Sequence, residues 1–409
     1  MRILWFSVTP SLFYPHSNSH NGGGWIASLE QIVRKEPTVE LGIAFNFNDS
    51  QFKYVNEGVS YYPISAPTSS SFDRLFHRKR NNSDLKTYKR IIDDFKPDLI
   101  QIFGSENDFG RICSLTNIPV VIHMQGCLPP YHNALFPIGM NQTDFYLRGG
   151  LTWHRRLMGL RSESAFSRGA AQEIHTIQQC RYFMGRTQWD KNLIDLFHPG
   201  AQYFHCEEAL RDSFIGCHRQ WALPDSCGHV KMVSVISNPW YKGVDLILKT
   251  ARLLATFTDL KFEWCVYGVS DIRFYEKKYK IQAKSVNIKV MGTASKDELV
   301  EALCNATCYV HPSYIDNSPN SLCEAQYLGV PVLATHVGGI SSLVSDGVSG
   351  LLFPANAPYT LASLIKQVVT SPQLAVRLGN AARKQAMERH NPEKIRQNLI
   401  HIYRQILGR

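Results

Sequence analysis

Long apolar runs are missing from this chain of 409 residues, since no run reaches the roughly 18 residues that a membrane-spanning helix needs. The opening segment Met1–Thr9 is apolar only briefly and then turns polar. It is too short for a secretory signal peptide and has no small-residue cleavage site. We therefore expect a buried first strand at Arg2–Val8.

The chain also lacks the paired cysteines of a Cys-x-x-Cys motif. The ten cysteines are scattered without any Cys-x-x-Cys motif, and several, such as Cys265, lie within apolar runs. In a chain without a recognised secretory signal, this pattern is typical of reduced, buried thiols. We expect a cytoplasmic protein, with peripheral attachment to the inner face of the plasma membrane as a further option.

Internal repeats and low-complexity tracts are also absent, and the composition, 44% hydrophobic and 19% charged, is that of an ordinary globular protein. Short apolar runs alternate with longer amphipathic stretches, which predicts βαβ units and parallel sheets. The predicted strands are Arg2–Val8, Val39–Asn46, Asp98–Phe103, Pro119–Met124, Lys231–Ser237, Lys261–Tyr267, Asn287–Met291, Thr307–His311, Pro331–Thr335 and Leu351–Phe353. The predicted helices include Asp84–Phe95, Val244–Leu254, Lys296–Cys304 and Ser321–Leu328.

A polar connector at Gly216–His229 divides this rhythm into two halves, each long enough to bury a core. We expect one α/β domain at residues 1–216 and a second at 217–391. Residues 392–409 contain an amphipathic helix that would pack back on the first domain. Doubly wound sheets bind ligands outside the carboxyl ends of their strands, so two facing domains would enclose a cleft suited to a two-substrate reaction.

The net charge of +10 is concentrated in two basic clusters. One comprises Arg74–Arg80 with Lys86, Lys89 and Arg90, and the other His154–Arg156 with Arg148, Arg161 and Arg168. They are either solvated faces or surfaces for anionic lipid headgroups or a pyrophosphate-bearing acceptor. No nucleic-acid module is visible, so no nucleic-acid partner is expected. The stretch Leu128–Gly169 is expected to be an irregular, mobile insertion that binds a ligand.

The segment Ser313–Ala325 carries the strongest chemical signal, since it follows a predicted strand and leads into a helix. Asn320 or Ser321 would cap that helix, whose start suits a pyrophosphate. Glu324 would lie in the first turn and accept two hydrogen bonds from a ribose diol, while Asp316 would face the same ligand from the loop. The alternative is a purely structural capping box, Ser321-x-x-Glu324.

Two further loops also follow predicted strands. Lys242 would stand at the start of a helix, where a cation opposes the helix dipole unless an anion is bound. Gly22, Gly23 and Gly24 would let the backbone approach a ligand closely. A solvated lysine and a plain flexible turn are the alternatives. The spacing Gly-x-Gly-x-x-Gly is absent, which argues against a dinucleotide-binding oxidoreductase.

His123 ends the predicted strand Pro119–Met124 and would project into the cleft between the domains. There it could bond a sugar hydroxyl or the leaving oxygen. A structural role for this histidine is the alternative.

Together these motifs resemble the retaining GT-B-fold glycosyltransferases of glycosyltransferase family 4. The resemblance covers most of the chain and is strongest from Lys231 to Pro354. It is carried by Lys242-Gly243, Cys265-Val-Tyr-Gly268, Met291-Gly292-x4-Asp297-Glu-Leu299, His311-Pro-Ser-x2-Asp316-x7-Glu324-Ala, Leu328–Ile340 and Gly347-x2-Gly350-Leu-Leu352. It implies the GT-B fold, with two Rossmann-like doubly wound domains facing a cleft.

The resemblance also implies roles for single residues. Glu324 would bind the nucleotide ribose and Asp316 the transferred sugar. Lys242 would neutralise the pyrophosphate. The remaining donor contacts would come from the backbone N–H groups of Asn320 and Ser321, from Gly22, Gly23 and Gly24, from Gly268 under the base or ribose, and from His123 near the reacting sugar.

Two positions depart from the family pattern. The first acid of the pair is Asp316 rather than glutamate, and its carboxylate is one methylene shorter in reach. Ser237 stands where the family has an arginine before the phosphate lysine. Arg186 is a candidate for the missing phosphate contact.

These features predict a retaining glycosyltransferase that moves a sugar from a nucleotide-sugar to a saccharide or lipid-linked acceptor, in cell-surface polysaccharide or glycoconjugate synthesis. A UDP-sugar is the first expectation for the donor and a GDP-sugar the second. No Asp-x-Asp motif occurs, so we expect no essential metal and no required cofactor. The alternatives are an inactive GT-B binding protein, a sugar-nucleotide epimerase and an NAD-type oxidoreductase.

Overall fold

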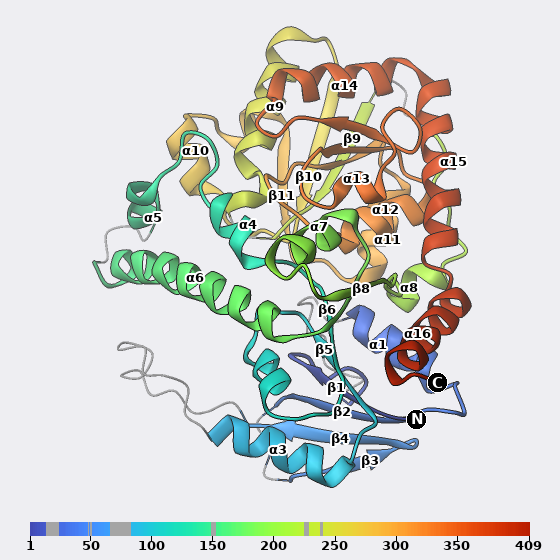
Figure 1. Cartoon of the computed structure of the whole chain (residues 1–409). Coiled ribbons are helices and arrows are strands. Elements are labelled where there is room, and N and C mark those ends of the chain that lie inside the picture. The colour runs from blue at the N-terminus through green and yellow to red at the C-terminus, as the bar shows by residue number, and fades with distance from the viewer. Residues whose placement is uncertain are drawn as a thin grey trace.

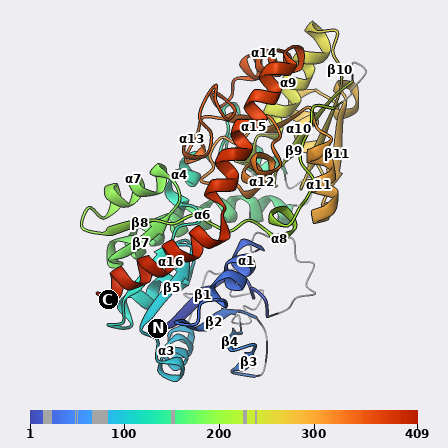
Figure 2. The same ribbon diagram turned by 90° about the vertical axis from the view of Figure 1, so that its right-hand side faces the viewer.

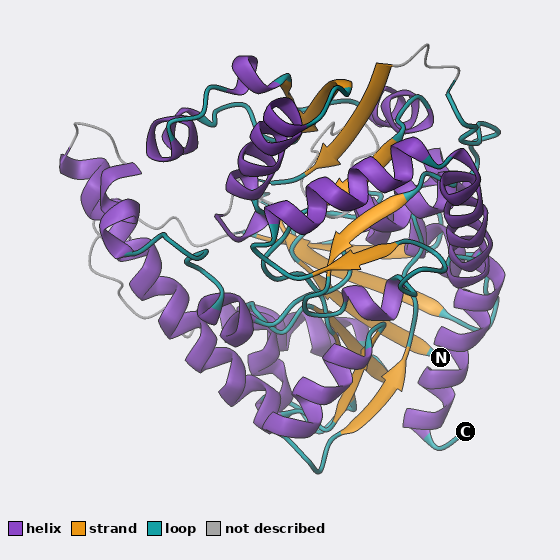
Figure 3. Cartoon of the chain, turned by 90° about the horizontal axis from the view of Figure 1, so that it is seen from above, coloured by secondary structure: helices purple, strands orange, loops and turns teal. Residues whose placement is uncertain are grey.

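The computed structural model describes residues 1–13, 24–47, 49, 51–65, 83–148, 153–224, 229–237 and 240–409. They form two α/β domains, one above the other in Figure 1, each built on a sheet of mostly parallel strands. Seen from above in Figure 3, the strands lie inside and helices cover them. The predicted fold class is confirmed.

The first domain contains an eight-stranded sheet with the order β3-β4-β2-β1-β5-β6-β7-β8, in which only the β3–β4 pair is antiparallel. Its strands are β1 Arg2–Ser7, β2 Glu40–Asn46, β3 Tyr54–Asn56, β4 Val59–Ile64, β5 Leu99–Phe103, β6 Val120–His123, β7 Tyr182–Gly185 and β8 Gln202–His205. Its helices are α1 Gly24–Val33, α3 Ser83–Phe95, η1 Asp108–Ser114, α4 Leu128–Asn133, α5 Gln142–Arg148, α6 Trp153–Gln179 and α7 Gln188–Phe197.

Strand β1 shows why helices must cover both faces of this sheet. Ile3 and Trp5 belong to one hydrophobic cluster, and Leu4 and Phe6 belong to another. All four side chains are fully buried. Successive side chains of a strand point to opposite faces, so a central parallel strand is apolar along its whole length.

The second domain contains a six-stranded sheet with the order β11-β10-β9-β12-β13-β14, and its pairs are parallel. Its strands are β9 His229–Val235, β10 Lys261–Tyr267, β11 Ile288–Gly292, β12 Cys308–His311, β13 Val332–Thr335 and β14 Leu351–Phe353. Its helices are η2 Trp240–Lys242, α9 Val244–Phe257, α10 Arg273–Tyr279, η3 Ala283–Val286, α11 Lys296–Cys304, α12 Asn320–Leu328, α13 Ile340–Leu343, α14 Pro358–Thr370 and α15 Pro372–Arg389.

The chain crosses between the domains twice. The first crossing runs from β8 to β9 and includes the short helix α8, Asp212–Ile215. The second is the turn from α15 into α16, Pro392–Leu407, which returns to the first domain, as Figure 2 shows. Leu399 of α16 packs in the same cluster as Trp5, and Trp5 Nε1 donates to Tyr403 Oη at 3.1 Å. The two crossings touch, since the His390 ring bonds Glu208 O at 2.7 Å.

The prediction for Leu128–Gly169 was wrong. Instead of an irregular insertion, this region forms α4, α5 and most of the 27-residue helix α6, which extends to one side in Figure 1. Tertiary packing stabilises α6, because it contacts η1, α4, α5 and α7. Glu173 of α6 accepts hydrogen bonds from Ser105 Oγ and from the Leu128 backbone N–H, and so ties the start of α4 to the helix.

The first domain also holds four strands that the sequence pattern missed, β3, β4, β7 and β8. All four have six residues or fewer and lie at the edges of the sheet or next to them, where the sequence pattern is short. Among the described cysteines, Cys113 and Cys180 form a disulfide, so the expectation of reduced thiols was wrong for this pair.

None of the described helices combines the length and apolarity needed to cross a membrane.

Candidate active site between the two domains

The residues of the candidate site follow the carboxyl ends of strands in both sheets. In the first domain, α4 follows β6 and Arg186 follows β7. In the second domain, Lys242 follows β9 and Asp316 follows β12. Because these edges of the two sheets face each other, side chains from both domains meet around the loop 312–319.

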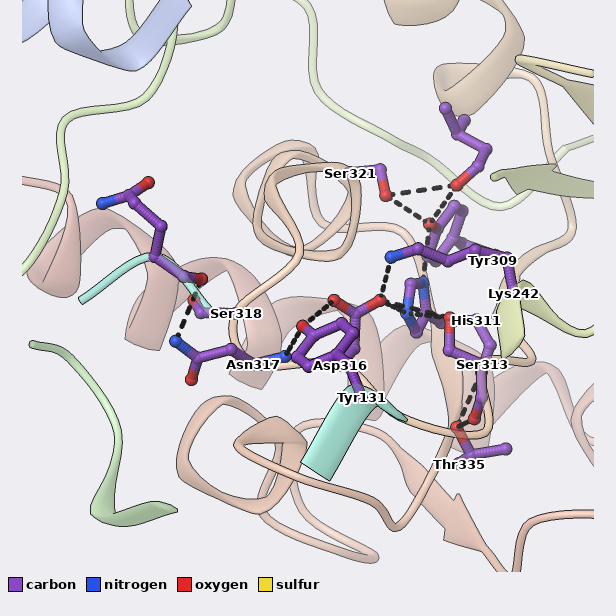
Figure 4. A network of polar contacts seen from close by, with 12 residues as sticks. Tyr131, Lys242, Tyr309, His311, Ser313, Asp316, Asn317, Ser318, Ser321 and Thr335 are labelled. Carbon is purple, nitrogen blue, oxygen red and sulfur yellow. Dashed lines mark hydrogen bonds and ion pairs between the residues drawn. The ribbon is translucent and has the colours of Figure 1, made fainter. Parts of the chain in front are cut away.

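Asp316 is the centre of this meeting, as Figure 4 shows. Its Oδ2 accepts hydrogen bonds from Lys242 Nζ at 2.6 Å, His311 Nε2 at 2.9 Å and Ser313 Oγ at 3.1 Å. Among the described residues, the hydrogen bond that reaches Oδ1 comes from Tyr131 Oη, at 3.5 Å. Burial alone would raise the pKa of Asp316, but Lys242 and His311 outweigh it and hold that pKa well below the ordinary range. The carboxylate is therefore ionised and fixed by one oxygen.

Gly243 brings Lys242 to this position. It has a positive φ of 80°, and a Cβ atom at Gly243 would lie 2.2 Å from Pro312 O. Only glycine lets η2 approach the loop after β12 so closely. The resulting ion pair is largely buried, with side-chain exposures of 16% for Lys242 and 7% for Asp316.

The start of α12 is not capped as predicted. Its N-cap residue is Pro319, which makes no side-chain hydrogen bond to the helix, so the prediction of a cap by Asn320 or Ser321 was wrong. Ser321 Oγ instead accepts from Tyr309 Oη at 2.9 Å and donates to Val235 O at 3.3 Å. The side chain that would otherwise cap the helix is thus used to attach α12 to the sheet.

Glu324 does not form the alternative capping box either, because it pairs with Arg211. Arg211 Nε lies 2.6 Å from Oε1 and Nη2 lies 2.7 Å from Oε2. Burial raises the pKa of Glu324, and the guanidinium opposes that rise by favouring the carboxylate. Arg211 lies in the first crossing, immediately before α8, and no sequence motif marked it.

Arg186 joins the two domains. Its Nη2 donates to Ser318 O at 2.9 Å, its Nη1 reaches Asn320 Oδ1 at 3.5 Å, and the same Nη1 pairs with Glu208. Burial raises the pKa of Glu208 to about 7, against the effect of Arg186. Arg186, the predicted phosphate contact, therefore lies next to the start of α12, but its guanidinium already pairs with the carboxylate of Glu208.

His123 lies deeper than the sequence suggested. Its side chain is fully buried and packs edge to face against Trp25, with ring centroids 5.3 Å apart. Burial, with Arg186 as a second cause, lowers its pKa to about 3, so the ring is neutral. Its Nδ1 lies 3.4 Å from Gln101 Nε2. Its Nε2 makes no hydrogen bond to the described residues but lies 3.9 Å from Glu208 Oε1.

The glycines of the predicted site are partly described. Gly22 and Gly23 lie outside the described residues, and Gly24 is the first residue of α1. Gly268 has a φ of 87°, and a Cβ atom there would lie 2.1 Å from Ile236 O. The backbone at the end of β10 thus lies against Ile236. The next residue, Ser237, is exposed.

Asn317 is a site residue that sequence reasoning missed. Its side chain is held by the first domain, accepting from Thr187 Oγ1 at 2.8 Å and donating to Asp190 Oδ1 at 2.8 Å and Gln125 O at 3.2 Å. Its backbone N–H donates to Tyr131 Oη at 3.0 Å. The spacing Thr187-x-x-Asp190 forms a capping box at the start of α7, and that signal could have drawn attention to this edge.

Comparison with known proteins agrees with this architecture. Residues 228–385 match the family model described as "Glycosyl transferases group 1". A D-inositol 3-phosphate glycosyltransferase of Streptomyces bingchenggensis is 34% identical over 110 residues, which cover 26% of this chain and 24% of that relative. The chain spans less than half the length of the curated relatives that it matches.

Solved structures resemble the chain over its whole length. Sucrose-phosphate synthase from Thermosynechococcus elongatus has a TM-score of 0.70 and 15% identity, covering 100% of this chain and 99% of that one. HepE of Anabaena, in complex with UDP-glucose, has a TM-score of 0.64 and 13% identity, covering 99% of this chain and 100% of that one. The chain is thus a two-domain GT-B protein whose second domain matches the glycosyl transferases group 1 model.

Proposed function

We propose that this protein transfers a sugar from a nucleotide-sugar to a hydroxyl group of a saccharide or lipid-linked acceptor, with retention at the anomeric carbon. The observation that carries the proposal is the grouping of Lys242, Asp316 and Glu324 around the start of α12, opposite the first domain. The match to the glycosyl transferases group 1 model supports it.

The donor is proposed to lie across α12, with the ribose at Glu324 and the diphosphate at Lys242 and the backbone N–H groups of Asn320 and Ser321. A UDP-sugar is proposed first, because HepE, which has a similar fold, was solved with UDP-glucose. Asp316 Oδ1, which has a single long contact with Tyr131 Oη, would accept a hydrogen bond from a hydroxyl of the transferred sugar. His123 Nε2, which is buried without a hydrogen bond to the described residues, would bond the same sugar.

Positive charge at the diphosphate is proposed to be the main catalytic contribution. Lys242 would stabilise the negative charge that develops on the departing phosphate. Asp316 is fixed by Lys242, His311 and Ser313, so it is poorly placed to attack the sugar as a nucleophile. The acceptor hydroxyl would instead approach the anomeric carbon on the face from which the diphosphate leaves. The hydroxyl proton would pass to the leaving phosphate oxygen, and the configuration would be retained.

Ligand-induced stabilisation tests the donor proposal. Purified protein is heated with a panel of UDP-, GDP- and ADP-sugars, and a bound donor raises the midpoint of unfolding. We expect UDP-sugars to give the largest rise, and release of the nucleoside diphosphate when an acceptor is added. A panel that neither stabilises the protein nor is consumed would contradict the proposal.

Two further points extend the proposal. Lys242 supplies a fixed positive charge, so turnover is expected to continue in excess EDTA, and complete loss restored by manganese would contradict this.

An anionic or lipid-linked acceptor is proposed from the net charge of +10. The cluster Arg74–Arg80 lies outside the described residues, as do most side chains of the second cluster. Binding to anionic liposomes at low salt is expected, and its absence would remove the membrane proposal.

A further inference from the structure

Arg211 is a cation at the proposed donor site that belongs to none of the family motifs. It binds both carboxylate oxygens of Glu324, the proposed ribose ligand. The Glu324 side chain is 3% exposed, whereas that of Arg211 is 23% exposed. Of the two, Arg211 is the one that solvent and ligands can reach.

The position of the Arg211 stem indicates a second contact. A Cβ atom added at Gly24 would lie 3.1 Å from both Cγ and Cδ of Arg211, so the stem runs along the start of α1. Gly24 is the last of the three glycines that we propose to face the diphosphate. Arg211 therefore runs from Gly24, beside its stem, to Glu324, at its guanidinium.

Two other cations of the site, Lys242 and Arg186, also have carboxylate partners, but theirs are not proposed to bind the ribose. Lys242 pairs with Asp316, and Arg186 pairs with Glu208. Ser237 occupies the position where the family resemblance expects an arginine. Arg211 is therefore the described cation whose partner, Glu324, the proposed ribose would take.

Binding of a ribose would change the situation of Arg211. When the two ribose hydroxyls take the oxygens of Glu324, the guanidinium loses its partner, and a half-buried charge without a partner is unfavourable. The fork of an arginine matches phosphate oxygens in geometry and charge. A nucleoside diphosphate therefore offers Arg211 a replacement partner, whereas a nucleoside alone does not.

We propose that Arg211 is a donor-binding residue that exchanges partners, holding Glu324 in the free protein and pairing with the diphosphate once the ribose binds Glu324. The proposal rests on the proposed function, because its ligand is a nucleoside diphosphate. It makes the diphosphate a condition for good ribose binding. Free nucleoside must break the Arg211–Glu324 pair without compensation, so it is a poor ligand.

Calorimetric titration with UDP and with uridine tests this exchange in the full-length protein. In Arg211→Ala, UDP is expected to bind about 10- to 100-fold more weakly, the usual effect of losing a hydrogen-bonded charge pair. Uridine is expected to bind as well as in the wild type or better, since Glu324 is released. Arg211→Lys keeps the charge without the fork and should give an intermediate affinity for UDP. Arg273→Ala, which removes an exposed pair with Asp271, is the control and should change neither ligand.

The two ligands together make the proposal falsifiable. Equal losses for UDP and uridine in Arg211→Ala would overturn it, since Arg211 would then only orient Glu324. Unchanged or tighter UDP binding would overturn it as well. If Arg211→Ala does not fold, Arg211→Lys decides: a loss confined to UDP supports the exchange, and any other pattern overturns it. A wild type that binds neither UDP nor GDP would instead overturn the proposed function itself.

Discussion

Asp316 and Asn317 are neighbours in the chain, but different domains hold their side chains. Asp316 Oδ2 bonds Lys242, His311 and Ser313, all from the second domain. Asn317 bonds Thr187, Asp190 and the Gln125 carbonyl, all from the first domain. The position of Asp316 Oδ2 is therefore set within one domain, whereas the position of the Asn317 side chain depends on the two domains being together. We infer that separation of the domains would release Asn317 and leave the Lys242–Asp316 pair intact.

Lys242→Ala is expected to have the largest effect, because it removes the second-domain cation that holds Asp316. It leaves the buried Asp316 without its cation and removes the proposed charge on the diphosphate. Sugar transfer is expected to fall about 10²- to 10³-fold, the usual effect of removing one group that stabilises a developing anion. Lys242→Arg should retain part of the rate. Steady-state kinetics measure both variants, and an Ala variant with wild-type kcat would contradict the assignment.

Asn317→Ala breaks the first-domain side. It removes three side-chain hydrogen bonds and leaves Asp190, whose pKa burial raises to about 6, with one partner fewer. A loss of about 2–3 kcal/mol in unfolding free energy is expected, at roughly 1 kcal/mol per bond. Urea unfolding measures it. The domains should also separate more readily, so proteolysis in the first crossing, residues 206–228, is expected to be faster. Unchanged stability would contradict the role given to Asn317.

Acid separates the two neighbours, because the pKa of Asp316 is strongly lowered whereas Asn317 does not titrate. The pKa of Asp316 is lower in the folded state than in the unfolded state, where an aspartate has a pKa near 3.9. This difference stabilises the fold at pH values above about 3.9, and the stabilisation is lost as the pH falls toward the folded-state pKa. Unfolding free energy should therefore fall steeply below about pH 4. In Asp316→Asn this acid-dependent loss should be smaller by about 1–2 kcal/mol. Identical slopes for the two proteins, measured by urea unfolding from pH 6 to pH 3, would contradict it.

Tyr131→Phe is the mildest change, because Tyr131 touches both neighbours, with its hydroxyl near Asp316 Oδ1 and the Asn317 N–H. Losing these contacts is expected to lower the transfer rate about fivefold, which corresponds to about 1 kcal/mol. Tyr359→Phe, at an exposed tyrosine, is the matched control. The rates of the two variants at saturating donor test this, and equal rates would show that the hydroxyl has no role.

The second domain was predictable because its signals are local. Lys242, Asp316 and Glu324 follow strands whose apolar runs are clear, and their bounds differ from the prediction by at most two residues. The groups that complete the site were not predictable in this way. Arg211 lies in a connector without periodicity, and Asn317 is defined by residues more than a hundred positions away. Helix α6 was missed because its packing against α4 and α5, rather than its own sequence pattern, stabilises it.

The contact between His390 and Glu208 has a mechanical consequence. This hydrogen bond holds the two chain connections between the domains side by side. Two connections held together in this way would allow the domains to hinge at this point and would oppose sliding of one domain past the other. We expect the site to open and close by this hinge motion. Tyr131, Asn317 and Arg211 would then return to the same positions after each turnover.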